Sequence, residues 1–231
     1  MITDRARCIR CGDCTEVCYA EAREIAGREM SVAQVMVEIE KELPFYDESE
    51  GGVTISGGEP LFQPDFLSKL LLACKEQEIH TALDTCGFAS WEVIDEIREY
   101  VDLFLYDLKL MDEARHQEFT GSSNEPILSN LRMLSERGHN IVLRMPIIPG
   151  INDDHENVRQ IGEFAMELPH FKGAAGHCQV DLLPYHHIAI EKYQRLNKTY
   201  ALAEVRPPSE ERMTEIAHIL RSYDLFVKIG G

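Results

Sequence analysis

Short apolar and β-branched runs alternate with stretches whose apolar positions recur at helical spacing, from residue 53 to the end of the chain. Short runs of this kind are typical of strands, and a spacing of three to four residues is typical of helices. The predicted strands are residues 53–55, 79–83, 103–106, 141–143, 179–183 and 225–229. Strands that alternate with helices favour a parallel sheet, so we predict an α/β fold with an open or partial parallel (β/α) barrel.

The helical stripes predict where the covering layer lies. The predicted helices are residues 32–43, 63–77, 91–98, 112–119, 127–136 and 155–168, and a last helix that Ser209 caps and that runs to about residue 223. Ser31 is predicted to cap the first of them. Cys74 falls on an apolar stripe and is expected to be a core residue. The acidic segment 45–50 is expected to be a solvated loop.

The segment after the first predicted strand carries two adjacent glycines. Ser56, Gly57 and Gly58 end the strand, Glu59 follows, and Pro60 suits the first turn of the next helix. Gly-Gly alone is more often a plain turn. A phosphate-binding loop would carry Lys with Ser or Thr, and a carboxylate repels phosphate. Open main-chain groups beside one carboxylate instead suit a cationic group, such as the ammonium of an amino acid.

Polar residues follow the later strands in the same way. They are Asp84 and Thr85, Asp107 and Lys109, Arg144, and His186. Each alone is more often a cap, a turn residue or a surface charge. In a parallel sheet, however, all of these strand ends lie at one edge, which is where α/β proteins bind ligands. Carboxylates for an ammonium and cations for a carboxylate together predict a site for a zwitterionic amino acid with a polar appendage.

Composition narrows the class of protein. The chain has 231 residues, of which 44% are hydrophobic and 27% charged, as in a globular protein with one sizeable core. Forty acidic side chains oppose 23 basic ones, and the net charge of −17 argues against a nucleic-acid partner. No apolar stretch is long enough for a membrane span. The N-terminus is polar and charged and does not have the apolar segment of a secretory signal. A cytoplasmic protein is expected.

Four of the seven cysteines form one run, Cys8-x-x-Cys11-x-x-Cys14-x-x-x-Cys18. This spacing is that of bacterial ferredoxins, whose thiolates hold a 4Fe–4S cluster, apart from the final Pro, which is Tyr19 here. A structural zinc site is the competing interpretation, and two overlapping Cys-x-x-Cys steps fit it less well. Ferredoxin runs normally occur in pairs, because the fourth cysteine ligates the other cluster. This chain has one run.

Taken together, the motifs resemble a known family. Ser56-Gly57-Gly58-Glu59-Pro60, Asp84-Thr85-x-Gly87, Asp107-Leu108-Lys109 and Leu183-Pro184-Tyr185-His186 are similar, in order and spacing, to the radical S-adenosylmethionine enzymes that activate glycyl radical enzymes, the pyruvate formate-lyase activating enzyme family. The resemblance runs from about Met30 to the C-terminus. The cysteine run resembles the ferredoxin-like insert of one subgroup. We therefore expect a partial insert at 1–30 and a partial radical SAM barrel at 31–231. Cys86 also fits this subgroup and is expected not to be a ligand.

The resemblance implies roles for individual residues. The main chain of Gly57, Gly58 and Glu59 would bind the methionine ammonium of S-adenosylmethionine. The methionine and ribose would be held by Asp84 and the segment Asp107, Leu108 and Lys109, with Arg144 nearby, and His186 would contact the nucleoside. Asp84, Thr85 and Asp107 would also bind a monovalent cation. In the family, a reduced 4Fe–4S cluster cleaves S-adenosylmethionine, and the resulting 5′-deoxyadenosyl radical takes a hydrogen atom from a glycine of the partner enzyme, so the implied partners are a glycyl radical enzyme and a flavodoxin- or ferredoxin-type reductant.

One departure from the family is large. The signature Cys-x-x-x-Cys-x-x-Cys, the first barrel strand and the first ferredoxin run have no counterpart, and Cys74, Cys86 and Cys178 do not restore the signature. The sequence thus predicts an activating enzyme that lacks its catalytic cluster cysteines and is inactive without that segment. The alternative is a ferredoxin-like electron-transfer or binding module with a vestigial S-adenosylmethionine pocket, and a zinc-binding structural protein is a third possibility.

Overall fold

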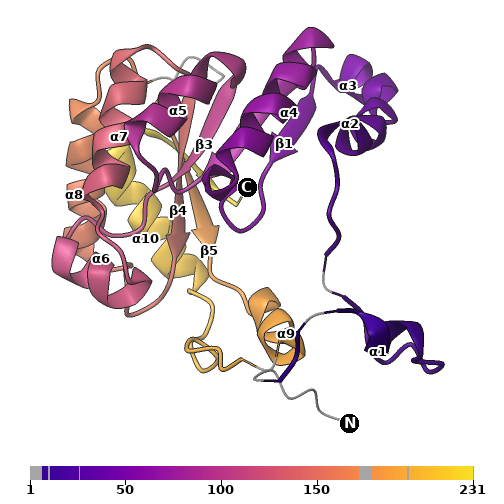
Figure 1. The fold of residues 1–231 in the computed structure, drawn as a ribbon. Coiled ribbons are helices and arrows are strands. Elements are labelled where there is room, and N and C mark those ends of the chain that lie inside the picture. The colour runs from indigo at the N-terminus through magenta and orange to yellow at the C-terminus, as the bar shows by residue number, and fades with distance from the viewer. Residues whose placement is uncertain (1–6, 10, 26, 172–177, 197, 231) are drawn as a thin grey trace.

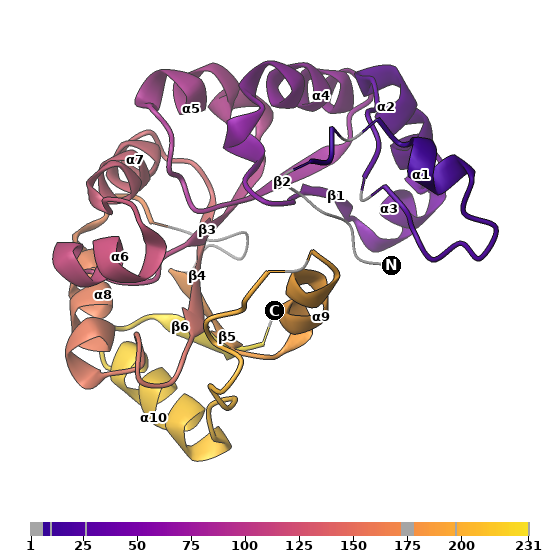
Figure 2. The same ribbon diagram turned by 60° about the horizontal axis from the view of Figure 1, so that its bottom comes forward.

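The computed structural model describes residues 7–9, 11–25, 27–171, 178–196 and 198–230. Its centre is a six-stranded sheet in the order β1-β2-β3-β4-β5-β6, and every neighbouring pair is parallel. The strands are β1 (Gly52–Ile55), β2 (His80–Thr85), β3 (Leu103–Asp107), β4 (Ile141–Ile147), β5 (Gln179–Pro184) and β6 (Phe226–Ile229). The sheet curves like part of a barrel wall (Figures 1 and 2). The predicted α/β class and parallel partial barrel are confirmed.

Helices cover the outer, convex side of this sheet, as Figure 2 shows. They are α4 (Pro64–Glu76), α5 (Trp91–Ile97), α6 (Glu113–Thr120), α7 (Glu125–Glu136), α8 (His155–Glu167) and α10 (Glu210–Arg221). The strand register explains why this side is apolar. Tyr106, Leu143, Val180 and Val227 are register partners across four strands, and each is at most 5% exposed. Alternate residues of a strand point to opposite faces, so the residues between them line the concave side.

The segment that was expected to be an acidic loop is a helix. After α2 (Val32–Glu40), which Ser31 caps with a capping box as predicted, the chain forms α3 (Leu43–Ser49). Pro44 lies in the first turn of α3, and Leu43 and Tyr46 pack against a small apolar cluster around Met36. These two apolar contacts hold the helix against the fold although Phe45 is exposed and the last three residues are polar, so the loop prediction was wrong.

Two other boundaries differ from the prediction because of proline. Pro60 begins a separate 3-10 turn, η1 (Pro60–Phe62), before α4 starts at Pro64. Pro146 was expected to end its strand, but β4 continues through it to Ile147. The Arg144 carbonyl accepts from the Leu108 amide and so faces β3. By the two-residue period Pro146 faces the same side, beyond the end of β3, so its missing N–H leaves no ladder bond unmade.

Two helices had no sequence prediction. The helix α9 (Ile188–Arg195) lies beyond the carboxyl ends of the strands, on the side that the outer helices leave open (Figures 1 and 2). The short α1 (Asp13–Glu16) is the only regular element that the described part of residues 7–30 contains. Residues 1–6, 10 and 26 of the predicted insert lie outside the described residues. None of the helices in the described ranges is both long enough and apolar enough to cross a membrane.

A glycine at the end of β2 gives a test of this packing. Gly87 has φ +69°, and a Cβ built on it would lie 1.7 Å from the hydroxyl oxygen of the buried Tyr106. Gly87→Ala should therefore lower the free energy of unfolding by more than about 3 kcal/mol, since both the backbone and the packing are strained. Gly138→Ala is the control, because φ is +76° there but nothing lies within 4 Å. It should cost about 1 kcal/mol. Urea unfolding followed by circular dichroism measures both, and equal losses would contradict this packing.

Candidate functional site

The loop after β1 presents bare main chain at the carboxyl edge of the sheet. Gly57 has φ +146°, a value that favours glycine, and both Gly57 and Gly58 are exposed. A Cβ built on either glycine would meet no atom within 4 Å. Close packing against another part of the fold therefore does not explain why these two positions are glycine. It leaves N–H and C=O groups open on the side of the sheet where a ligand can approach.

Glu59 ties this loop to the end of β2. Its Oε1 accepts from the Thr85 hydroxyl at 2.6 Å and from the Leu61 amide at 3.2 Å, and its Oε2 accepts from the Cys86 amide at 2.9 Å. The sequence suggested that this carboxylate faces a cationic ligand. In the structure its oxygens are occupied by donors of the protein, so any ligand contact at this loop falls to the main chain.

An ion pair joins the ends of β2 and β4 across the concave face. Arg144 Nη1 lies 2.6 Å from Asp84 Oδ1, and the two side chains are 22% and 24% exposed. The other Asp84 oxygen accepts from the Ser56 hydroxyl at 2.9 Å. Ser56 was named in the sequence only as a strand breaker, and here it links the glycine loop to Asp84. The pair holds one carboxylate and one guanidinium within reach of the same approaching group.

A second ion pair lies at the end of β3. Lys109 Nζ is 3.1 Å from Asp107 Oδ2, and these side chains are 32% and 24% exposed. Partly exposed pairs of this kind stabilise a fold by little, about 0–1 kcal/mol. A ligand that carries both charges can therefore replace the internal partner at small cost. The two pairs together supply the carboxylates and cations that an amino-acid group requires.

The register places a row of alternating charge across the concave face. Asp107, Arg144, Asp181 and Lys228 are successive register partners on β3, β4, β5 and β6. Asp181 is 7% exposed and accepts from Gln179 Nε2 at 2.8 Å. Neither Asp181 nor Lys228 was predicted from the sequence as a residue of the site. A single Asp inside the otherwise apolar run of β5 is the signal that marks the first of them, since an unsupported carboxylate is costly there.

The other predicted binding residues are placed differently. Leu108 is buried in the core, and its amide donates to the Arg144 carbonyl, so it can offer a ligand only its main chain. The buried Thr85 hydroxyl donates to Glu59 and accepts from the Gly87 amide. Among the described residues, no three His, Cys, Asp or Glu side chains are grouped so as to hold a metal ion. The cation site at Asp84, Thr85 and Asp107 stays a prediction.

Within the described part of the chain, no hydrogen bond or ion pair joins His186 to either of these pairs. Its side chain is exposed, and its Nδ1 accepts from the Ile188 amide at 3.4 Å, at the start of α9. The predicted contact between His186 and a nucleoside therefore remains a prediction. Its position after β5 puts it at the same edge of the sheet as the charged residues.

The predicted iron ligands lie in the N-terminal segment. Cys8, Cys11 and Cys14 are exposed, and Cys18 is half-buried. They are not gathered into a group that could hold a metal within the part of the chain that the structure describes. Figure 1 places α1, which contains Cys14, well away from β1. The cluster at these cysteines also stays a prediction.

Cys86 is the thiol closest in sequence to the candidate site, and it is protonated at neutral pH. Burial, and after it the hydrogen bond with the Glu59 carboxylate, raises the pKa of Cys86 from 9.0 to about 11. Metal ligation requires the thiolate form. The expectation that Cys86 is not a metal ligand stays a prediction.

The chain is similar to a known protein family and to several enzymes within it. The profile of the Radical SAM superfamily matches residues 14–161. The chain is 46% identical, over 91% of its length and 68% of the relative's, to the trans-4-hydroxy-L-proline dehydratase activating enzyme of Clostridioides difficile. It is 40% identical, over 97% of its length and 71% of the relative's, to the choline trimethylamine-lyase activating enzyme of Oleidesulfovibrio alaskensis.

Among solved structures, the chain resembles a domain of the pyruvate-formate lyase-activating enzyme from Bacteroides vulgatus. The TM-score is 0.63 and the identity 36%, over 78% of this chain and 99% of that domain. The chain thus spans about two thirds of the length of the curated relatives and nearly all of this solved domain.

The pKa of Cys86 gives a pH test of the site. The folded protein favours the neutral thiol, so this group stabilises the fold fully below pH 9.0 and loses that contribution as the pH rises through about 11. At pH 8 a thiol with a pKa of about 11 holds about a hundredfold less thiolate than an ordinary one. Iodoacetamide should therefore label Cys86 about a hundredfold more slowly than the exposed Cys14, as peptide mass spectrometry can measure. Similar rates for the two cysteines at pH 8 would contradict a neutral Cys86 tied to Glu59.

Proposed function

Because this chain belongs to the Radical SAM superfamily, we propose that it is an activating enzyme that binds S-adenosylmethionine at the carboxyl edge of its sheet and serves a glycyl radical enzyme as its partner. The observation that carries the proposal is the pairing of Asp84 with Arg144 and of Asp107 with Lys109 beside the open main chain of the glycine loop. The amino-acid end of S-adenosylmethionine has one ammonium and one carboxylate. Both find partners there.

Each residue would act on a definite part of the ligand. The main chain of Gly57 and Gly58 would accept from the ammonium, and Asp84 would add a charge-assisted bond. Lys109 and Arg144 would donate to the carboxylate, each leaving its internal carboxylate partner. When bound in a radical SAM protein, S-adenosylmethionine supplies a 5′-deoxyadenosyl group that becomes the hydrogen-abstracting radical. The residues of this chain bind and orient the ligand.

The iron–sulfur chemistry of the superfamily includes a 4Fe–4S cluster. We propose that Cys8, Cys11, Cys14 and Cys18 hold such a cluster in the N-terminal segment. The carboxyl edge of the sheet does not fit a cluster bound by this chain, because its cysteine there, Cys86, is a protonated thiol engaged by Glu59. No step of the reaction is therefore assigned to a cluster at that edge.

The partners follow from the family. Activating enzymes of this kind act on a separate glycyl radical enzyme, and the relatives named above activate a hydroxyproline dehydratase and a choline lyase. We propose a partner of the same class for this chain, with a flavodoxin- or ferredoxin-type protein as electron donor. An iron site with thiolate ligands is suited to the reducing cytoplasm, and we propose that the protein resides there. The alternative of an electron-transfer or binding module finds no support in the relatives.

Removal of one cation tests the proposed ligand site. Lys109→Ala should weaken S-adenosylmethionine binding by more than about 1 kcal/mol, because a charge-assisted hydrogen bond is lost. Lys75→Ala is a matched control, since Lys75 pairs with Asp102 just before β3, at the opposite edge of the sheet. Isothermal titration of each variant measures the affinity. Unchanged affinity in Lys109→Ala would remove Lys109 from the site, and an equal loss in Lys75→Ala would indicate general destabilisation.

Iron content tests the cysteine assignment separately. After anaerobic reconstitution with iron and sulfide, the chain should hold at most one cluster, about four iron atoms per polypeptide. Cys11→Ser should lose most of this iron, because one of the thiolate ligands is gone. Cys86→Ser should keep it, because Cys86 is a neutral thiol outside the cluster. Iron and sulfide determination measures both, and two clusters per chain, or loss of iron in Cys86→Ser, would refute the assignment.

A further inference from the structure

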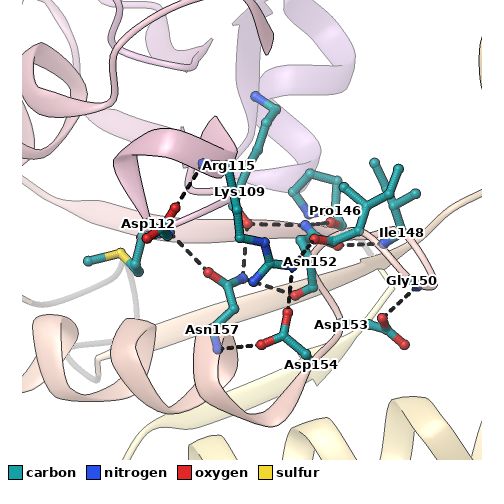
Figure 3. Close-up of polar contacts among 12 residues, drawn as sticks. Lys109, Asp112, Arg115, Pro146, Ile148, Gly150, Asn152, Asp153, Asp154 and Asn157 are labelled. Atoms are coloured by element: carbon teal, nitrogen blue, oxygen red, sulfur yellow. Dashed lines mark hydrogen bonds and ion pairs between the residues drawn. The ribbon is translucent and has the colours of Figure 1, made fainter. Parts of the chain in front are cut away.

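The segment that carries Lys109 leaves the sheet without entering a helix. β3 ends at Asp107, α6 begins at Glu113, and residues 108–110 have no regular secondary structure. Main-chain groups that are buried outside a ladder or a helix need other partners. Figure 3 shows two of these partners, the side chains of Asn152 and Asn157.

Two buried asparagines hold the carbonyl of Lys109. Asn152 Nδ2 donates to it at 3.2 Å and Asn157 Nδ2 at 3.1 Å. Asn157 Oδ1 also accepts from the Met111 amide at 3.0 Å. The two asparagines are 1% and 2% exposed. One carbonyl oxygen thus uses both of its lone pairs on side-chain amides that lie 43 and 48 positions further along the chain.

A third buried asparagine continues the same arrangement. Asn124 Nδ2 donates to the carbonyls of Leu110 at 3.1 Å and of Met111 at 2.8 Å, and its side chain is 4% exposed at the N-cap of α7. Three consecutive carbonyls, from Lys109 to Met111, therefore accept hydrogen bonds from asparagine side chains. We call Asn124, Asn152 and Asn157 the asparagine bracket.

The bracket is itself anchored. Asn152 Oδ1 accepts from the Ile148 amide at 2.7 Å and its Nδ2 donates to the Pro146 carbonyl at 2.6 Å, which fixes it to the end of β4. Asn157 Nδ2 donates to the Asn152 carbonyl at 2.9 Å. Among the described residues, every buried side-chain nitrogen or oxygen atom has a hydrogen-bond partner, and this includes the amide atoms of these asparagines. Aspartate at the same place would lack the donors, and leucine would leave the carbonyls unpaired.

An outer layer closes the loop that supplies Asn152. Arg115 donates from Nη2 to the Ile151 carbonyl at 2.6 Å and to Asp154 Oδ2 at 2.8 Å, as Figure 3 shows. Asp154 caps α8 by accepting from the Asn157 amide at 3.0 Å. The β4–α8 loop is thereby joined to α6, the helix that follows the Lys109 segment.

The effect on Lys109 is specific. On one side the Leu108 amide is bonded to Arg144, and the Leu108 and Leu110 side chains are both buried. On the other side the bracket holds the Lys109 carbonyl. The main chain is fixed on both sides, so Nζ can move only through its side-chain torsions. Because the main chain of Lys109 is already fixed, only the torsions of its side chain lose entropy when it binds a ligand, which is a smaller loss than for a lysine on a mobile loop.

We propose that Asn124, Asn152 and Asn157 are positioning residues for Lys109, which set its main chain so that Nζ meets the carboxylate of S-adenosylmethionine. This inference rests on the proposed function and extends it to residues that do not touch the ligand. Buried asparagines can also serve the fold alone. The two roles predict different results, because a positioning role changes the binding of the methionine end of the ligand and leaves the binding of its nucleoside unchanged.

The experiment compares two ligands in one variant. Asn157→Ala removes one of the two donors to the Lys109 carbonyl and leaves Asn152 in place, so the chain is expected to fold. It should bind S-adenosylmethionine about tenfold more weakly, the effect of one buried hydrogen bond. Its affinity for 5′-methylthioadenosine, which lacks the amino-acid end, should change by less than about twofold. Equilibrium dialysis with labelled ligands measures both affinities.

Four further measurements complete the design. Ser135→Ala is the control, because Ser135 is fully buried on α7 and loses one hydrogen bond to Pro169, far along the helix from the bracket. Asn157→Ala added to Lys109→Ala should cost no further affinity, since the bracket acts through Lys109. Asn157→Asp keeps an acceptor for Met111 but loses the donor, and it should match Asn157→Ala. Hydrogen exchange of the Met111 amide in the free protein reports the bracket without any ligand.

The outcomes separate the possibilities. A selective loss for S-adenosylmethionine, absent from Ser135→Ala and from the Lys109→Ala background, supports the positioning role. Equal losses for both ligands, additive losses in the double variant, or faster Met111 exchange with unchanged affinity would overturn it. If the unmodified chain binds neither ligand while Met111 remains protected, the proposed function fails, the positioning role fails with it, and the bracket is purely structural.

Discussion

The loops that follow the strands depend on one constraint, which is that main-chain groups leaving the ladder must still find hydrogen-bond partners. The fold meets it with buried side chains. Glu59 accepts from the Cys86 amide, Asn130 donates to two carbonyls of the loop after β2, and Asn157 donates to the Lys109 carbonyl. Each of these bonds joins a loop to a different element. The carboxyl edge of the sheet is therefore fixed in shape before a ligand arrives, as a precise binding site requires.

The same constraint divides the polar residues into two groups. Side chains that hold the main chain, such as Glu59 and Asn152, have their hydrogen-bonding groups occupied and cannot also bind a ligand. Among the described residues, the side chains of Asp84, Arg144 and Lys109 are bonded only to other charged or hydroxyl side chains of the concave face, and they are about a quarter to a third exposed. Such pairs are weak in water and can be exchanged. Burial and hydrogen bonding, more than residue type, decide which carboxylate is structural.

The sequence predicted the sheet well because the apolar periods are long and regular, and it predicted the charged edge because parallel strands bring their ends together. It failed where tertiary contacts override local patterns. Two apolar contacts keep α3 helical, and Pro146 stays in β4 because β3 has already ended. It could not find the asparagine bracket, since Asn124 and Asn152 have the pattern of cap or turn residues, and the carbonyl that Asn157 of α8 holds lies 48 positions away. Nor could it show that Glu59 is occupied.

Charge balance on the concave face gives a reason for the kind of ligand. Asp84 pairs with Arg144, Asp107 pairs with Lys109, and Asp181 is the register partner of Lys228, so three negative charges are set beside three positive ones. A lone anion that paired with one of these cations would leave that cation's carboxylate partner unpaired, and a lone cation would likewise leave a cation unpaired, so one charge of the ligand's own sign would be in excess. A zwitterionic group adds one charge of each sign and keeps the face neutral. These six charges contribute nothing to the net charge of −17, which comes from the other charged residues of the chain.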